Sequence, residues 1–421
     1  MIDDIRPPRP PKPKEPNLPP PPPPVAPAAP SAPDPSLPEP EATIDLPAEG
    51  EPAKKRGLGR VRHHWYNFSR LEKISALVGL LIILAGIGLS SYLLFIRKSP
   101  QPITYTYIKK VKPAPKPVTT PSPLTGLPVD PALAKRPVTG VMIENTPPAR
   151  PQSGLQDAGV VFEAIAEAGI TRFLALFQDT QPQYVGPVRS LRPYYIDFAT
   201  PFDASIAHVG GSPDALSQIR SGGKDLDQFF NAGAYWRISS RAAPHNVYTS
   251  FAKLDALNAA KGYTSSQVQS WPRKADAPLK TPTAKSINFN PSWDDYKVHY
   301  DYDKASNSYL RSEGGAPHKD LVSASDTTGV QLHPKVVIAL VIGLSNGALD
   351  ASGAYYSDYQ DTGSGTAYVF QDGGVIEGSW SKADRASQFS FTDSTGKPIK
   401  LDAGQTWLTL VGRASQVSYS P

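Results

Sequence analysis

The side chains best suited to chemistry lie between residues 144 and 246. Glu144 ends a short apolar run, His208 ends another, and His245 follows Pro244 in a polar loop. A histidine can act as a general acid or base near neutral pH, and a carboxylate can do the same when its surroundings adjust its pKa. We therefore take Glu144, His208 and His245 as candidate catalytic residues.

Several residues in the same region could hold an anionic ligand. Arg189 and Arg192 lie three residues apart, and paired guanidinium groups bind phosphate or carboxylate bidentately. A Gly-Gly-Ser-Pro turn before a predicted helix could offer backbone N–H groups to an anion. The candidate ligand-binding residues are Asn145, Arg150, Arg172, Arg189, Arg192, Gly210, Gly211, Ser212, Arg241, Asn246 and His318.

Structural explanations compete with each of these interpretations. Glu163 and Glu167 lie in an apolar run close to Arg172, which is typical of a structural ion pair. His208 could simply close its strand with a satisfied hydrogen bond. The two glycines could serve only the tight turn between strand and helix. The residue types alone leave open whether the protein is an enzyme.

A divalent cation has one candidate site. His299, Asp301 and Asp303 would share one face of a strand, and oxygen and imidazole ligands suit such ions. An exposed polar strand face explains the same spacing. We therefore expect no metal site, and no cofactor motif is evident in the sequence.

Composition divides the chain of 421 residues into distinct parts. Twenty of the 47 prolines fall in residues 1–53, which predicts a disordered, extended tail that could bind a cytoplasmic proline-recognising partner. A basic segment follows over residues 54–73. Residues 74–96 form an uncharged apolar run long enough to cross a bilayer as one helix. Residues 97–122 resemble a Pro/Lys/Thr linker.

The charge distribution points to a membrane and away from nucleic acid. The net charge of +5 comes from residues 1–116, which carry +7, whereas residues 117–421 carry −2. The basic flank can therefore meet anionic lipid headgroups, and the folded part lacks the positive surface that nucleic acid requires. The absence of cysteine suits an exported domain. We expect the N-terminus in the cytoplasm and the folded part outside it.

The folded part should combine α+β or α/β architecture in two lobes. Apolar runs separated by turns predict a mixed-sheet first lobe over residues 123–270, with helices at 213–219 and 251–260. A polar stretch over 271–285 is the expected linker. Residues 286–421 should form a β-rich second lobe of mostly antiparallel strands.

Several motifs of the folded part resemble one bacterial family. They are RPVTGVMIEN (136–145), ARPQSGL (149–155), GPVRSLRPYYIDFA (186–199), HVGGSP (208–213), RAAPHNVYTS (241–250) and GAPHKD (315–320). Together they are similar to the YerB-like extracytoplasmic lipoproteins, whose domain of unknown function has two parts. The resemblance implies export and this architecture but no reaction. A lipoprotein needs an acylated cysteine, so here the apolar helix would replace the lipid.

A shorter stretch resembles the LytR-CpsA-Psr phosphotransferases, which act on polyprenyl-pyrophosphate donors. That resemblance would place Arg189 and Arg192 on the phosphates and let Ala207, Gly210 and Gly211 shape the turn. The carboxylate that would hold Mg²⁺ has no match. Two hypotheses follow: a membrane-anchored module that binds cell-wall glycan, a phosphorylated ligand or a protein partner, and an envelope enzyme that acts on phosphorylated or glycan substrates in an Arg/His cleft.

Overall fold

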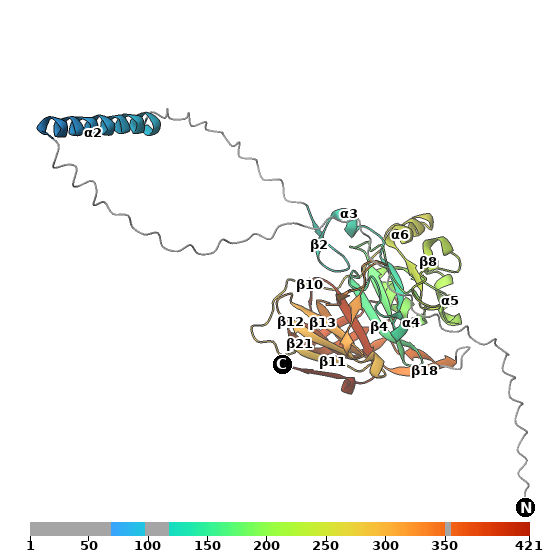
Figure 1. Cartoon of the computed structure of the whole chain (residues 1–421). Coiled ribbons are helices and arrows are strands. Elements are labelled where there is room, and N and C mark those ends of the chain that lie inside the picture. The colour runs from blue at the N-terminus through green and yellow to red at the C-terminus, as the bar shows by residue number, and fades with distance from the viewer. Residues whose placement is uncertain (1–68, 97–117, 350–354) are drawn as a thin grey trace, which may run out of the picture. The chain divides into compact units, whose positions relative to one another are not determined.

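The computed structural model of the protein describes residues 69–96, 118–349 and 355–421 (Figure 1). The chain separates into two compact units, residues 1–110 and 111–421. The expected proline-rich tail (1–53), most of the basic segment (54–73) and most of the linker (97–122) lie outside the described residues. The last residues of that linker already belong to a strand, β1 (Thr120–Pro121).

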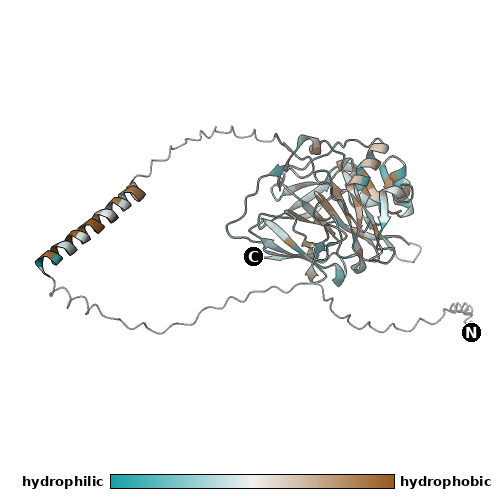
Figure 2. Ribbon diagram, turned by 45° about the horizontal axis from the view of Figure 1, so that its top comes forward, coloured by the Kyte–Doolittle hydropathy of each residue, from teal (hydrophilic) through white to brown (hydrophobic). Residues whose placement is uncertain are grey.

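The first unit contains one apolar helix, α2 (Arg70–Ser91), continued by a π-helical turn η2 (Tyr92–Ile96). Ser69 starts the helix with a capping box: its hydroxyl accepts from the Glu72 amide, and the Glu72 carboxylate accepts from the Ser69 amide. The cap moves the start four residues before the predicted one. Figure 2 shows hydrophobic residues along nearly the whole helix, and the stretch Arg70–Phe95 is long and apolar enough to cross a membrane.

A mixed sheet joins strands from both halves of the second unit. From edge to edge its order is β22 (Ser390–Asp393), β21 (Gly374–Lys382), β20 (Gly363–Gln371), β17 (Val336–Val341), β24 (Thr406–Val411), β4 (Val160–Glu167), β5 (Ile170–Phe177), β3 (Thr139–Glu144), β6 (Ser205–His208) and β7 (Lys224–Asp227). A hairpin, β18 (Leu344–Leu349) and β19 (Tyr355–Tyr359), joins the same sheet through β4.

The strand β24 is inserted between the two halves. It runs parallel to β17 on one side and to β4 on the other. The second half is otherwise mostly antiparallel, as expected, and the parallel pairs of β24 are the exception at the centre of the sheet. The mixed sheet predicted for the first half is present, and it continues without a break into the second.

The remaining elements cover this sheet. Four helices belong to the unit: α3 (Pro131–Ala134), α4 (Pro193–Ala199), α5 (Pro213–Arg220) and α6 (Phe251–Ala260). A second sheet has the order β14 (Ala316–Pro317), β13 (Ser308–Glu313), β12 (Val298–Asp303), β11 (Ser286–Phe289) and β25 (Val417–Ser420). Short pairs are β1 with β2 (Pro128–Val129), β8 (Tyr235–Arg237) with β9 (Val247–Thr249), β10 (Arg273–Lys274) with β23 (Leu401–Asp402), and β15 (Lys319–Asp320) with β16 (Val330–Gln331).

Alternating side chains place the core on both faces of the sheet. On β5, Leu174 and Leu176 join the cluster that contains the apolar residues of α4 and α5. Phe173 and Ala175 point to the opposite face, where the core includes residues of α6. Farther along that second face, residues of β17 and β20 pack on the five-stranded sheet. These buried strands fix the ends from which the candidate residues project.

Candidate functional site

The parallel part of the sheet brings three polar residues to one edge. β3 is parallel to β6, and β6 is parallel to β7, so their carboxyl ends lie at the same edge. Glu144 ends β3, His208 ends β6 and Asp227 ends β7. Ligand sites in open sheets with parallel strands usually form outside the carboxyl ends of the strands. The edge at which these strands end is therefore the candidate site.

Glu144 and His245 form a hydrogen-bonded pair, which we call the Glu144–His245 dyad. The Glu144 Oε1 atom lies 2.8 Å from His245 Nδ1 and also accepts from the Thr146 hydroxyl at 2.8 Å. Because a carboxylate only accepts, the contact places a proton on His245 Nδ1, and in the neutral ring Nε2 then carries the lone pair. Glu144 is buried, whereas the His245 side chain is 22% exposed. The dyad thus presents an oriented imidazole to solvent.

Arg189 lies beside the dyad. Its Nε atom is 3.3 Å from Glu144 Oε1, and its side chain is 25% exposed. The geometry of that contact does not make a hydrogen bond, and the guanidinium donates no hydrogen bond to any residue that the structure describes. Its backbone is fixed between strands, since its amide donates to Met142 O and its carbonyl accepts from Val209. Arg189 is therefore a held cation with unused donors.

Two more arginines surround a second carboxylate close by. Glu167 accepts from Arg172 at 2.7 Å and from Arg192 at 2.6 Å, and these arginines lower its pKa against the opposing effect of burial. Burial lowers the pKa of Arg189, Glu144 opposes that shift, and repulsion from Arg172 and Arg192 adds to it. Three guanidinium groups thus face two carboxylates. The group carries an excess of positive charge that favours an anion.

His208 lies apart from the dyad and is used within the fold. Its ring contacts Gly210 O through Nδ1 at 2.8 Å and Asp225 Oδ1 through Nε2 at 3.0 Å, and it is fully buried. The glycine turn is also occupied: the Gly210 amide donates to Asp227, and the Ser212 amide donates to Leu191 O. The Ser212 hydroxyl caps α5, as predicted, by accepting from Ala215. These contacts favour a structural role over ligand binding, both for His208 and for this turn.

Arg241 and Asn246 hold loops together. The Arg241 guanidinium donates to the carbonyls of Ala149 and Pro151, and the Asn246 amide donates to Ile238 O and Arg241 O. Both residues therefore fix the loops that flank the dyad. The N–H groups that make these contacts are satisfied by backbone carbonyls, so they are not available to a ligand.

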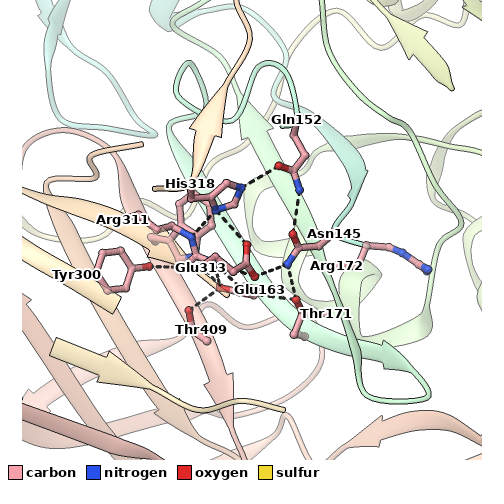
Figure 3. Close-up of polar contacts among 12 residues, drawn as sticks. Asn145, Gln152, Glu163, Thr171, Arg172, Tyr300, Arg311, Glu313, His318 and Thr409 are labelled. Atoms are coloured by element: carbon pink, nitrogen blue, oxygen red, sulfur yellow. Dashed lines mark hydrogen bonds and ion pairs between the residues drawn. The ribbon is translucent and has the colours of Figure 1, made fainter. Parts of the chain in front are cut away.

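A second polar cluster lies inside the molecule and joins the two halves of the chain (Figure 3). We call it the inter-half network; it consists of Asn145, Gln152, Glu163, Thr171, Tyr300, Arg311, Glu313, His318 and Thr409. Arg311 is fully buried and lies 3.1 Å from both oxygens of Glu163. It also donates to Tyr300 at 2.7 Å and to His318 Nδ1 at 2.9 Å.

The network fixes the protonation of His318. Because Arg311 donates to Nδ1, the imidazole is neutral and its Nε2 proton faces Gln152 Oε1 at 2.9 Å. Burial, together with Arg311, lowers the pKa of His318 well below its usual value. Burial raises the pKa of Glu313 to about 7, although Arg311 and Arg150 act against this rise. His318 is therefore an acceptor and donor within the core.

Arg150 and Asn145 connect this network to the surface. The Arg150 guanidinium donates to Asn145 Oδ1 and to the carbonyls of Asn145 and Asp295. A hollow of about 380 Å³ opens next to it, with Glu313 and His318 among its lining residues. His318, a candidate ligand-binding residue, has other partners than the dyad: its ring contacts Gln152, whereas the His245 ring contacts Glu144.

Sequence reasoning missed Arg311, Glu313 and Gln152. One signal was available: Glu163 lies in a fully apolar run, and a buried carboxylate requires a cationic partner. Tyr309, Arg311 and Glu313 alternate along β13, which indicates one shared face. The structural alternative was an ion pair between Arg172 and a neighbouring glutamate, Glu163 or Glu167. The structure contains such a pair between Arg172 and Glu167, whereas Glu163 pairs with Arg311.

The side chains considered as a cation site at residues 299–303 contact one another or neighbouring protein groups. His299 lies 2.8 Å from Asn288 and 3.1 Å from Asp301, and Asp303 accepts from the amides of Ala305 and Ser306. Across residues 69–96, 118–349 and 355–421, no group of three or more His, Asp or Glu side chains is placed to hold a metal ion. The expectation that the protein uses no cofactor stays a prediction.

These features define a class of protein: a mixed α/β domain with a partly exposed Glu-His-Arg site, on a chain that carries an apolar helix long enough to span a membrane. The chain belongs to the DUF3048 family. Residues 124–264 match the family described as "Protein of unknown function (DUF3048) N-terminal domain", and residues 287–408 match its C-terminal domain.

Relatives in Bacillus subtilis agree with this assignment. The chain is 33% identical over 313 residues to "Putative lipoprotein YerB" of strain 168, covering 71% of this chain and 88% of the relative. The crystal structure of the YerB protein matches with a TM-score of 0.62 at 31% identity, covering 72% of this chain and all of the solved chain. The predicted YerB-like family and its two-part domain are confirmed. The relative is a lipoprotein and thus membrane-associated, and in this chain α2 could provide the anchor.

Proposed function

We propose that this protein is a membrane-anchored, extracytoplasmic module that binds a ligand with a phosphate or carboxylate group at Arg189 and the Glu144–His245 dyad. The observation that carries the proposal is the state of Arg189: its backbone is held between strands, and its guanidinium is three-quarters buried without a hydrogen-bond acceptor among the described residues. Glu144 lies within ion-pair distance, but buried N–H donors that lack an acceptor are costly. A bound anion would supply the missing hydrogen bonds and offset the repulsion from Arg172 and Arg192.

Calorimetric titration tests this proposal. Pyrophosphate, inorganic phosphate and acetate would be titrated into wild-type protein and into Arg189→Gln. A charge-assisted hydrogen bond contributes about 1.5–3 kcal/mol, so Arg189→Gln should weaken binding roughly 10- to 100-fold. Arg413→Gln, which removes an exposed arginine, should leave affinity unchanged. Equal heats from wild type and Arg189→Gln would contradict the proposal.

A second function, an envelope enzyme acting on phosphorylated or glycan substrates, is favoured by one observation. The dyad holds His245 with Nδ1 on a buried carboxylate, the arrangement in which Nε2 serves as a general base. His245→Asn should then lower the turnover of a phosphoester by a much larger factor than it lowers anion affinity. If the wild-type protein binds anions but turns over no ester, the binding function stands alone.

The cellular arrangement is part of the same proposal. The N-terminus would lie in the cytoplasm, with its proline-rich segment free to meet a cytoplasmic partner, and residues 118–421 would lie outside. Seven basic residues in 54–73 against six in 97–116 favour this orientation only slightly, and the exported character of the YerB-like family adds to it. Protease added to intact cells should degrade the folded part and spare the N-terminal segment; the reverse pattern would contradict this orientation.

A further inference from the structure

Two adjacent phenylalanines project into solvent from the turn that follows β7. Phe229 is 69% exposed and Phe230 is 71% exposed. The turn itself is firmly held: the Phe229 amide donates to the Asp227 carboxylate, the Phe230 amide donates to Asp227 O, and the Asn231 side chain donates to the same carbonyl. The rings are therefore presented to water by a fixed backbone, at the same edge of the sheet where β7 ends.

The apolar surface continues beyond the two rings. Phe230 lines a hollow of about 550 Å³ together with Ala232 and Gly233, and with Ala252 and Ala256 on the outer face of α6. We call Phe229, Phe230 and these small residues the aromatic patch. Contiguous exposed apolar surface on a soluble unit usually marks an interaction site.

Cationic groups border the aromatic patch. The Arg220 guanidinium lies 5.0 Å from the centre of the Phe230 ring, and Lys253 lines the same hollow. Arg220 is 43% exposed and pairs with the buried Asp227 at 3.1 Å, so one side of its guanidinium is engaged and the rest faces solvent. Phenylalanine flanked by lysine and arginine is the composition that binds the interface of an anionic bilayer.

The folded unit lies on the same chain as α2, which is long and apolar enough to cross a membrane, so a bilayer is the partner that the chain itself brings near this unit. Residues 97–117 connect α2 to Val118 and can span at most about 75 Å. The Arg136 guanidinium donates to both oxygens of Asp255 at 2.8 Å, which ties the first part of the unit to α6, the helix that contributes to the patch. Figure 1 shows α5 and α6, which flank the turn, on the same side of the unit.

We propose that the aromatic patch docks onto a lipid bilayer that exposes anionic headgroups, with Phe229 and Phe230 inserted at the interface and Arg220 and Lys253 on the headgroups. Because β3, β6 and β7 end at the same edge of the sheet, this contact would turn the carboxyl ends of those strands toward the bilayer. The proposal does not depend on anion binding at Arg189.

Vesicle co-sedimentation of residues 118–421 tests the proposal. The solved relative corresponds to this part of the chain alone, so the fragment can be studied without α2. It should bind vesicles of equal parts phosphatidylcholine and phosphatidylglycerol, and bind phosphatidylcholine vesicles more weakly. The double variant Phe229→Ser/Phe230→Ser should lower partitioning at least about 50-fold, because each ring loses its apolar burial. Trp293→Ser removes a ring that is 62% exposed elsewhere and should change little.

The charge contribution is tested separately. Arg220→Gln/Lys253→Gln should lower binding to the mixed vesicles several-fold, and this difference should shrink as salt is added. Circular dichroism would establish that each variant is folded. Wild-type protein that fails to partition into either vesicle, or that partitions no better than the double phenylalanine variant, would overturn the proposal and assign the patch to a protein contact.

Discussion

Replacing Arg311 with methionine should expose the energetic role of the inter-half network. Arg311 is fully buried and is the cation that lies 3.1 Å from both oxygens of Glu163 and 3.5 Å from Glu313. Methionine fills a similar volume but leaves buried carboxylates without that partner. Removing one partner of a buried ion pair costs about 3–5 kcal/mol, because the remaining charge stays desolvated.

The magnitude can be measured as a thermal shift. For a unit of roughly 300 residues, each kcal/mol moves the Tm by about 1.6 °C, so Arg311→Met should lower the Tm by about 5–8 °C. Differential scanning calorimetry and urea unfolding of residues 118–421 would give the Tm and the free energy of unfolding. Arg413→Met is the matched control at an exposed arginine, with an expected change within about 0.5 kcal/mol.

A double variant separates the charge from the packing. Adding Glu163→Gln to Arg311→Met removes one of the stranded carboxylates and should recover part of the loss, a coupling of about 1–3 kcal/mol. A loss of less than about 1 kcal/mol for Arg311→Met would refute the role given to this ion pair. The two substitutions could also lower the free energy of unfolding by the sum of their separate effects, which would show that Arg311 and Glu163 are not coupled.

Two further predictions concern the folded unit. Burial raises the pKa of Glu313 and of Asp320 to about 7, above their ordinary values, so the folded protein retains protons that the unfolded chain has already lost. Its free energy of unfolding should therefore fall as pH rises from about 5 to about 7. Glu313→Gln should flatten that slope in urea titrations, whereas an unchanged slope would contradict the assignment of this titration to Glu313. Gly378 lies on β21 opposite β22, and a Cβ there would be 2.0 Å from the Thr392 carbonyl oxygen. Gly378→Ala should therefore cost about 2–3 kcal/mol in the same assay, against little change for Gly233→Ala, where the space is open.

Local patterns predicted the elements but not their partners. The α5 and α6 helices start at the predicted residues, because Ser212 and Ser250 are N-caps that can be read from a few neighbouring positions. The position of β24 between β17 and β4 depends on pairings between residues more than 60 positions apart, and no local signal carries it. Apolar composition therefore predicted strands without predicting that one sheet would unite both halves.

The candidate site shows the same division. Glu144, Arg189 and His245 were chosen for their residue types, and the fold brings them together although they are up to 101 positions apart. His208 had the same chemical promise, but Asp225 lies on the neighbouring strand and its carboxylate contacts the imidazole. The ion pair expected near Arg172 forms with Glu167, whereas the partner of Glu163, Arg311, lies 148 positions away and carries no local signal. Residue type thus indicated which groups could react, and tertiary pairing decided which groups remain accessible.

The proposed anion site can be tested most directly by locating an anion in a crystal. Crystals of residues 118–421 soaked in tungstate, a heavy-atom analogue of phosphate, would show by anomalous scattering where the ion binds. We predict a peak within hydrogen-bonding distance of the Arg189 guanidinium and next to His245, absent from crystals of Arg189→Gln. Anomalous peaks found only at other positions, or a peak that persists in Arg189→Gln, would contradict the central claim that this partly exposed arginine and the Glu144–His245 dyad form the ligand site.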